Sequence, residues 1–347
     1  MKTLIFAAIL CASAALQGQS ISLESWMDSY VASLPTGQHF RGNILVERDG
    51  RVILERSYGY AVEGWKVLNT RESHFEIASL TKQFTAAAIL QLAEAGRLSI
   101  QDPVSKYYAQ SPPAWRAITI EELLTHSSGI PNNDLKDYTK GIAAPYSTEE
   151  LVDTFRDKPL AFSPGTKWAY TNTEYYLLAY IVERVSGESY GAYLTEHIFE
   201  PLKMSHSEFA SNHSVIPNMT EGYTSQDGRL WLCEYFDRSL ETGAGGISTS
   251  VEDLLTWNRA LNQPGFLSAR SLEDMFTIHP PGHYGFGWFV QDKPVRMIWH
   301  EGGDPGFAAF EARYPDQHLI IIVLANEDDA PVRQVSQAVA DHLGVSK

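Results

Sequence analysis

The sequence predicts an α+β fold in which an antiparallel sheet, built from both ends of the chain, carries an inserted, mostly helical domain. Strand-like runs lie before residue 60 and again after residue 284, helical patterns dominate between them, and a helix is predicted near each end. With 347 residues and about 150 residues per domain, two units fit. We place the sheet domain at 21–78 and 284–347, the helical domain at 79–283, and the active site in the cleft between them.

The amino-terminal part of the predicted sheet domain contains one helix and one hairpin. Apolar residues recur at near-helical spacing over 22–34, which favours an amphipathic helix. Two strand-like runs, 43–48 and 51–56, flank the pair Asp49-Gly50. An Asp-Gly pair between two such runs is a strong indicator of a tight β-hairpin.

The middle of the chain is predicted to be mostly helical, and strands return near the carboxy terminus. Helices are expected at 79–95, 149–155 and 175–185. Another runs through Trp257, with Ser250 and Asp253 spaced as in a capping box. Four strands and a closing helix are predicted at 285–290, 296–299, 307–313, 318–324 and 331–343. Because both ends of the chain supply strands, we expect them to share one sheet.

Composition and charge exclude several classes of protein. Hydrophobic residues make up 44% of the chain and charged residues 20%, which is typical of a globular protein. The formal net charge is -15 and no cluster of Lys and Arg is present, so we expect no nucleic-acid partner. The sequence contains no P-loop, no dinucleotide-binding glycine motif and no H-E-x-x-H, and we expect neither cofactor nor metal. Nothing in the sequence indicates the oligomeric state.

The first twenty residues predict a secretory signal peptide. Lys2 precedes an apolar run at 4–10, and Ala12-Ser13-Ala14 resembles a cleavage site. The apolar run is shorter than a membrane-spanning helix, which needs about 20 residues. We therefore expect an exported protein, periplasmic or extracellular, with no stable membrane insertion once residues 1–20 are removed. Cys233 would then be the remaining cysteine, and we expect a half-buried strand residue rather than a nucleophile there.

Ser79-Leu80-Thr81-Lys82 is the sharpest chemical motif. At i and i+3 near the start of a helix, a hydroxyl and an ammonium group lie on one face within contact range. The helix amino terminus adds backbone N–H groups and a positive dipole beside the hydroxyl. A serine becomes a nucleophile when a base lies next to it, and a lysine can serve if burial lowers its pKa from about 10.4. On its own, the motif also fits a capping serine followed by a surface lysine.

Two further elements follow at long spacing. In Tyr170-Thr171-Asn172, a phenol that can move a proton lies two residues before an amide that can bridge lysine and substrate. His300-Glu301-Gly302 lies at the end of a predicted strand, where a glycine permits close approach of a substrate backbone. Taken singly, each also fits a structural residue.

Together, the three elements resemble the serine β-lactamase and penicillin-binding protein superfamily, in its class C-like branch, where the motifs are S-x-x-K, Y-x-N and H-x-G. Further stretches at 123–131, 201–204, 243–249 and 284–288 resemble the same branch. The resemblance extends over roughly residues 25–343 and implies a β-lactamase/transpeptidase-like fold. It also implies a serine hydrolase that works through an acyl-enzyme and acts on a small-molecule or peptide substrate.

The resemblance assigns roles to individual residues. Ser79 would be the acylated nucleophile and Lys82 its close base, while Tyr170 would carry a proton to the leaving group and Asn172 would orient Lys82. Which of Lys82 and Tyr170 takes the serine proton stays open. The oxyanion hole would consist of the backbone N–H groups of Ser79 and Gly303. The substrate-binding residues it implies are Gly302 and Asn326, and His300 completes the catalytic set.

The sequence departs from the β-lactamase pattern where a substrate carboxylate would bind. The third motif usually begins with a permanently charged lysine, whereas His300 is mostly neutral at pH 7. The segment that contains Asn326 continues into the acidic run 327–329. We therefore expect ester, amide or D-amino-acid peptide hydrolysis rather than efficient cephalosporin hydrolysis. H-x-G relatives that resemble D-aminopeptidases and esterases favour the same expectation.

Two alternatives stay open at this point. β-Lactamase or D-Ala-D-Ala carboxypeptidase activity is the enzymatic one. A non-catalytic peptidoglycan- or peptide-binding protein with the same fold is the other, although the intact set of motif residues argues against it. We expect His126 to hydrogen-bond within a loop below the site, and the glycine-rich run 243–246 to pack as a tight turn behind it.

Overall fold

The computed structural model describes residues 22–35, 40–133 and 135–345. The predicted signal peptide, residues 1–20, lies outside these ranges. In the part of the chain described, no helix combines the length and the apolar character that crossing a bilayer requires.

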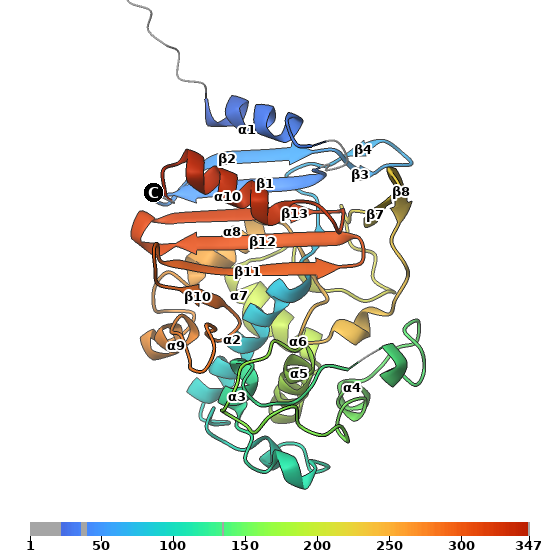
Figure 1. The fold of residues 1–347 in the computed structure, drawn as a ribbon, viewed down its shortest axis with the longest axis vertical. Coiled ribbons are helices and arrows are strands. Elements are labelled where there is room, and N and C mark those ends of the chain that lie inside the picture. The colour runs from blue at the N-terminus through green and yellow to red at the C-terminus, as the bar shows by residue number, and fades with distance from the viewer. Residues whose placement is uncertain (1–21, 36–39, 134, 346–347) are drawn as a thin grey trace, which may run out of the picture.

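A six-stranded antiparallel sheet unites the two ends of the chain, in the order β10-β11-β12-β13-β1-β2. Figure 1 shows the amino-terminal strands beside the carboxy-terminal ones, with the helical part on one side of the sheet. The α+β prediction is confirmed. The strands are β1 (Gly42–Arg48), β2 (Arg51–Tyr58), β10 (Phe289–Gln291), β11 (Met297–Asp304), β12 (Phe307–Tyr314) and β13 (Leu319–Ala325).

Both faces of this sheet are covered, which explains its nearly continuous apolar strands. In β1, Ile44 and Val46 face the terminal helices, while Leu45 between them joins the larger core shared with the helical part. The turn between β1 and β2 has positive φ at Asp49 (52°) and Gly50 (75°). Such a turn matches the twist of the two strands, and the predicted hairpin is confirmed.

The two predicted terminal helices are present, and both pack on one face of the sheet. They are α1 (Leu23–Ala32) and α10 (Val332–His342), and their apolar side chains share one core with the sheet. Trp26 of α1 stacks on His342 of α10 with ring centroids 3.9 Å apart. The first and last segments of the described chain are thereby held together on the face opposite the helical part.

The inserted segment contains the remaining helices and three small sheets. Its central helix is α2, which is almost completely buried and packs against α5, while α8 packs on β1 and β13. The helices are α2 (Thr81–Glu94), α3 (Ile120–Leu124), α4 (Thr148–Asp153), α5 (Thr173–Ser186), α6 (Tyr190–Leu194), α7 (Glu200–Leu202), α8 (Val251–Ala260) and α9 (Ala269–Met275). The small sheets are β3 (Tyr60–Val62) with β4 (Val67–Leu68), β5 (Phe75–Glu76) with β9 (Ile247–Thr249) and β6 (Glu208–Phe209), and β7 (Tyr223–Gln226) with β8 (Arg229–Leu232).

Three local predictions need correction. The strand predicted at 285–290 forms only from Phe289, because Gly287 has a φ of +79° and Gly285 lies against the backbone of Met275. The capping box at the start of α8 is half formed: Ser250 accepts from the Asp253 amide, but the Asp253 carboxylate accepts from the 206–207 turn. Cys233 is half-buried but lies one residue beyond β8.

Candidate active site

Ser79 lies in a 3-10 turn, Ala78–Leu80, that leads directly into α2. The residue before it, Ala78, has a φ of +47°, a left-handed conformation that is costly for a residue with a β-carbon. This turn leaves Ser79 only half-buried at the start of an otherwise buried helix. The nucleophile predicted from the sequence is therefore accessible, and the helix amino terminus lies directly behind it.

Lys82 lies one helical turn after Ser79, and its side chain is completely buried. Its Nζ is 3.0 Å from Ser79 Oγ, 2.9 Å from Asn172 Oδ1 and 3.0 Å from the carbonyl oxygen of Ala244. The structure thus brings together the first two sequence motifs from positions about 90 residues apart. Ala244 belongs to the glycine-rich turn 243–246 and is a contact that the sequence motifs did not predict.

The surroundings of Lys82 favour its neutral form. Burial lowers the pKa of its amine to about 7, against a smaller opposing effect of Glu241, Asp304 and Glu174. A neutral amine has two N–H groups and one lone pair. The oxygens of Asn172 and Ala244 can only accept hydrogen bonds, so they take both N–H groups, and the lone pair faces Ser79 Oγ. This is the geometry of a general base acting on a serine hydroxyl.

Tyr170 lies beside this pair as a neutral phenol. Lys82 Nζ is 4.9 Å from the centroid of its ring. Burial raises the pKa of Tyr170 above its usual value of 10, nearby carboxylates add to the increase, and the Ser79 hydroxyl partly offsets it. Because a phenol with a raised pKa keeps its proton at neutral pH, Tyr170 is suited to donate a proton rather than to remove one.

His300 is buried, and the structure leaves it without a charge. Its Nδ1 is 2.7 Å from the carbonyl oxygen of Glu301, so Nδ1 carries the proton and donates it. Its Nε2 is 2.8 Å from the hydroxyl of Tyr284 and therefore accepts from it. Burial lowers the pKa of the imidazole to about 3. The ring centroids of His300 and Tyr170 are 6.0 Å apart. His300 therefore contributes a neutral ring and a hydrogen bond at this position, and not a positive charge.

Gly302 allows β11 to lie directly against the turn that holds Ser79. A β-carbon at position 302 would be 2.3 Å from the carbonyl oxygen of Ile77 and 3.1 Å from the amide nitrogen of Ser79. The next residue, Gly303, is exposed, and a β-carbon there would meet nothing within 4 Å. The strand therefore brings Gly303 beside the nucleophile, where its N–H is predicted to complete the oxyanion hole.

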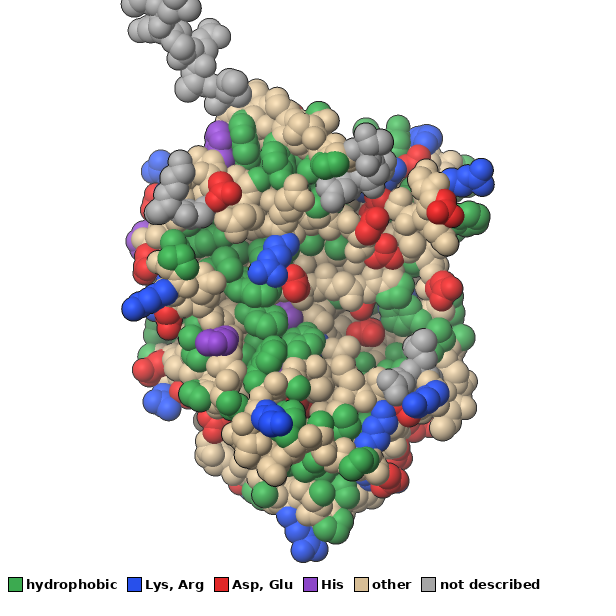
Figure 2. All heavy atoms as spheres, in the orientation of Figure 1, with side chains coloured by type: hydrophobic (Ala, Val, Ile, Leu, Met, Phe, Trp, Pro, Cys, Tyr) green, Lys and Arg blue, Asp and Glu red, His purple; other side chains and the backbone are tan. Residues whose placement is uncertain are grey.

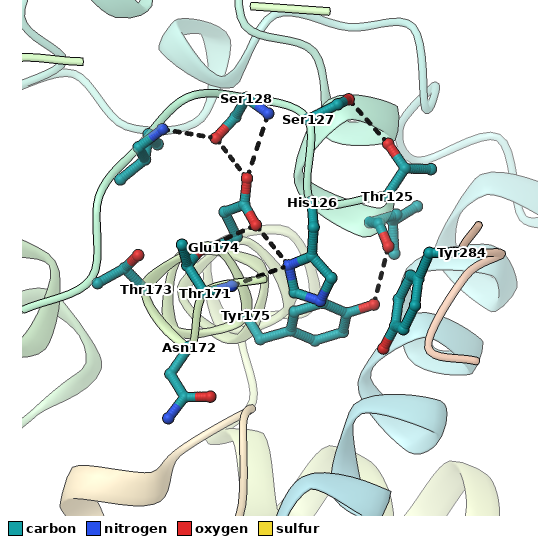
Figure 3. A network of polar contacts seen from close by, with 12 residues as sticks. Thr125, His126, Ser127, Ser128, Thr171, Asn172, Thr173, Glu174, Tyr175 and Tyr284 are labelled. Atoms are coloured by element: carbon teal, nitrogen blue, oxygen red, sulfur yellow. Dashed lines mark hydrogen bonds and ion pairs between the residues drawn. The ribbon is translucent and has the colours of Figure 1, made fainter. Parts of the chain in front are cut away.

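A buried polar network supports the Tyr170–Asn172 segment from below, and Figure 3 shows it with Asn172 directed away from it. Glu174 accepts from the Ser128 hydroxyl at 2.5 Å and the Thr171 hydroxyl at 2.9 Å, and its other close contact is His126 Nδ1 at 2.5 Å. Burial raises the pKa of Glu174 to about 8, and it lowers the pKa of His126 well below its usual value. The Thr171 amide also donates to His126 Nδ1, so this nitrogen is an acceptor and carries no proton of its own. The proton in the contact between His126 Nδ1 and Glu174 therefore belongs to Glu174.

Asn326 is not accessible to a substrate, which corrects its assignment as a substrate-binding residue. It is completely buried, and its amide nitrogen donates to the carbonyl oxygens of Tyr60, Ala61 and Glu221. Its Oδ1 accepts from Asn69 at 3.2 Å. The side-chain polar atoms of Asn326 therefore join the end of β13 to β3 and to the loops that contain Asn69 and Glu221. The side-chain amide of Asn326 is therefore structural.

The acidic run 327–329 lies only in part where it was expected, because Asp328 lines the same groove as Gly303 and Asp304. Glu327 is buried and forms an ion pair with Arg41, with Oε2 3.1 Å from Nε. Asp328 accepts from the Thr224 hydroxyl and the Gly306 amide, and Asp329 is exposed. The carboxyl groups whose charge reaches Lys82 or Tyr170 belong to Glu241, Asp304, Glu174 and Glu301. Of these, only Glu301 lies within one of the three sequence motifs.

The glycine-rich turn 243–246 packs tightly behind the site, as predicted. A β-carbon at Gly243 would be 2.4 Å from the carbonyl oxygen of Tyr175. Within the described ranges, one group of side chains has the spacing of a metal site: Glu188, Glu196 and His197. None of the three belongs to the motifs around Ser79.

Comparison with known proteins agrees with this geometry. The family model described as Beta-lactamase matches residues 27–345, nearly all of the described chain. The chain belongs to the Beta-lactamase family. Its sequence is 31% identical to penicillin-binding protein 4* of Bacillus subtilis over 88% of this chain and 72% of that protein. Members of this superfamily are serine hydrolases, and the predicted fold and superfamily are confirmed.

Solved structures show the same family fold. The octameric penicillin-binding protein homologue from Pyrococcus abyssi is 29% identical and superimposes with a TM-score of 0.81, covering 92% of this chain and 77% of that one. The D-amino acid amidase from Ochrobactrum anthropi SV3, complexed with D-phenylalanine, is 21% identical with a TM-score of 0.80. It covers 94% of this chain and 99% of the amidase chain, and at this identity it shows the fold alone.

Proposed function

We propose that this protein is an exported serine hydrolase that forms an acyl-enzyme on Ser79 and cleaves an ester, an amide or a D-amino-acid peptide. The observation that carries the proposal is the environment of Lys82. Its buried amine has two acceptors other than Ser79, at 2.9 and 3.0 Å, which leaves its lone pair directed at the Ser79 hydroxyl. A binding protein would have no need for a buried lysine whose pKa is lowered to about 7 beside a half-exposed serine.

The proposed reaction uses these groups in order. Lys82 takes the hydroxyl proton while Ser79 Oγ attacks the substrate carbonyl carbon, and the resulting oxyanion accepts from the N–H groups of Ser79 and Gly303. Tyr170 then donates its phenol proton to the leaving group, and the proton on Lys82 replaces it. Water, activated by the same lysine, attacks the acyl-enzyme and releases the acid product. The proton count is unchanged at the end of the cycle.

The charges around the site favour substrates without a carboxylate at this position. His300 is neutral, so the permanent cation of the lysine-type motif is missing. Glu241, Asp304 and Glu301 contribute negative charge near Tyr170. A substrate carboxylate would be repelled there, which supports ester, amide or peptide hydrolysis. The names of the penicillin-binding relatives favour β-lactam or D-Ala-D-Ala substrates as the second candidate.

One labelling experiment tests the proposal. The mature protein is treated with a fluorescent fluorophosphonate and, separately, with a fluorescent penicillin, beside Ser79→Ala. We expect stoichiometric fluorophosphonate labelling that Ser79→Ala abolishes. Labelling that survives this substitution would show that another residue is the nucleophile, and absence of labelling and of turnover would favour a binding protein.

A substrate panel then separates the two enzymatic candidates. We expect turnover of p-nitrophenyl esters or D-amino-acid p-nitroanilides and little turnover of nitrocefin. Nitrocefin turnover approaching that of a dedicated β-lactamase would contradict the first candidate and establish the second. Secretion is tested by expressing the full chain in a bacterial host and comparing the periplasmic and cytoplasmic fractions.

A further inference from the structure

Two carboxyl groups, those of Asp304 and Glu241, lie close enough to Lys82 for their charge to raise its pKa, and the proposed reaction uses neither. Asp304 is the last residue of β11, directly after Gly303. Glu241 ends a 3-10 turn of the helical part, and its backbone oxygen accepts from the Ala244 amide at 3.0 Å. Since the Ala244 carbonyl holds Lys82, each carboxyl group comes from a segment that is already fixed at the catalytic centre.

Asp304 has an oxygen that the protein leaves without a partner. Its Oδ2 is buried and accepts no hydrogen bond from the described residues. The cations whose charge it feels are Lys82 and Arg238, but Arg238 forms an ion pair with the buried Glu76. A buried carboxyl oxygen without a donor is costly, and such a group at a functional site indicates a missing ligand. Burial and the proximity of Glu241 accordingly raise the pKa of Asp304.

The space beside Asp304 suits an amino-acid side chain. A groove of about 700 Å³ is lined by Gly303, Asp304, Pro305, Trp231 and Leu232, and also by the acidic residues Glu234 and Asp328. The two hydrophobic residues of β8 are largely exposed, Trp231 by 54% and Leu232 by 65%. On the face drawn in Figure 2, acidic side chains gather beneath the β3–β4 and β7–β8 hairpins and in the hollow below them. The groove therefore combines exposed apolar side chains with several carboxyl groups, of which Asp304 is the one that adjoins Gly303.

We propose that Asp304, assisted by Glu241, binds a free ammonium group on the acyl part of the substrate, so that the enzyme prefers amino-acid amides, amino-acid esters or the amino-terminal residue of a peptide. This inference rests on the proposed function. The α-amino group lies two bonds from the carbonyl carbon that Ser79 attacks, and Asp304 adjoins Gly303, the predicted oxyanion donor. An ammonium group would donate to the unpartnered Oδ2, and an apolar side chain would lie along Trp231 and Leu232.

The test compares matched substrates that differ only in the charge of the amino group. D- and L-phenylalanine p-nitroanilides are assayed beside their N-acetyl derivatives, and the ratio of kcat/KM for free to acetylated substrate is measured. We expect a ratio of about ten or more, which falls about tenfold or more in Asp304→Asn, in line with a hydrogen bond to a charged group. Any effect of Asp304→Asn on Lys82 changes kcat/KM for the free and the acetylated substrate alike, so it cancels in the ratio. Asp316→Asn, which alters an exposed carboxylate that does not line the groove, serves as the control and should keep the ratio.

A binding experiment tests the subsite without chemistry. Ser79→Ala is titrated calorimetrically with D- and L-phenylalaninamide and with their N-acetyl forms, and the titration is repeated in Ser79→Ala/Asp304→Asn. We expect tighter binding of the free amines, lost in the double variant. Equal binding of free and acetylated amides, or a kcat/KM ratio near one, would overturn the inference while Ser79 labelling still supports the hydrolase. Absent labelling together with preferential amine binding would overturn the proposed hydrolysis and leave an amine-binding site.

Discussion

Lys82 Nζ lies 3.0 Å from Ser79 Oγ, and its remaining contacts go to carbonyl oxygens that can only accept hydrogen bonds. The protein thereby fixes the direction of the lysine lone pair without an additional charged partner in contact with the amine. Which of Lys82 and Tyr170 removes the serine proton was open from the sequence. The geometry favours Lys82, since burial moves the two pKa values in opposite directions, lowering that of the amine and raising that of the phenol.

The pH dependence of acylation follows from the lowered pKa of Lys82. Because the base must be neutral, the acylation rate should rise with pH with an apparent pKa near 7. The negative charge of Glu241 raises this pKa, so Glu241→Gln should move the rising limb to lower pH. Stopped-flow acylation between pH 5 and 9 measures both. Asp316→Asn, an exposed carboxylate in a surface turn, is the control. A limb that moves to higher pH in Glu241→Gln would contradict the assignment.

Removal of the Tyr170 hydroxyl should affect substrates according to their leaving group. Tyr170→Phe should slow the cleavage of an anilide or amide by about 100-fold or more, because such a leaving group needs a proton in the transition state. A p-nitrophenyl ester of the same acyl group needs no such proton and should lose much less. The ratio of the two kcat values checks this. An equal loss for both substrates would indicate that Tyr170 acts on Ser79 rather than on the leaving group.

Gly302 and Gly303 form a pair of substitutions with different expected effects. Gly302→Ala places a β-carbon 2.3 Å from the Ile77 carbonyl oxygen and so pushes β11 away from Ser79. We expect a loss in kcat of about 100-fold, comparable to the loss of one oxyanion donor. Gly303→Ala keeps the backbone N–H and meets nothing within 4 Å, so it should lose much less. Similar losses in both variants would show that the close packing of β11 against the Ile77 carbonyl is not the reason why position 302 is a glycine.

Glu174 should stabilise the protein as a neutral acid. Glu174→Gln can still donate to His126 Nδ1 and should cost about 1 kcal/mol, whereas Glu174→Ala leaves several buried groups unpartnered and should cost about 3 kcal/mol or more. The folded protein holds the Glu174 proton up to about pH 8, above the usual carboxyl pKa of 4.5. Folding then binds a proton between these values, so the stability from Glu174 is full below about pH 4.5 and declines toward pH 8. Urea unfolding of both variants at pH 5 and pH 8 measures this difference.

Asn326 should matter for stability and not for catalysis. Asn326→Ala removes contacts to three carbonyl oxygens and to Asn69, and we expect a loss of about 2–3 kcal/mol in the free energy of unfolding. Turnover per folded molecule should stay near that of the unsubstituted protein. Asp329→Asn, three residues along and exposed, should change neither quantity. A large rise in KM at unchanged stability would restore Asn326 to the substrate site.

Most of the fold could be predicted from local sequence patterns. The Asp49-Gly50 hairpin, the strands near both ends and the terminal helices appear as short-range signals, and the structure places them in one sheet. The exact start of β10 could not be predicted, because it depends on contacts of Gly285 with the distant Met275 backbone. The contacts among Ser79, Lys82 and Asn172 could be predicted from the sequence motifs, because the spacing of the motifs along the chain identifies the superfamily.

The sequence by itself determined the fold class, the family and the identity of the reacting groups, because periodicity and motifs depend on residues close in the chain. Only the tertiary structure decided the charge state of those groups and what surrounds them. It buried Lys82 against Ala244, placed Asn326 in structural contacts and paired Glu327 with Arg41. It also brought Asp304 and Glu241 close to Lys82, and from the acidic run 327–329 it placed Asp328, but not Glu327, in the groove beside Gly303. Burial and charge proximity arise between distant segments, so no local pattern records them.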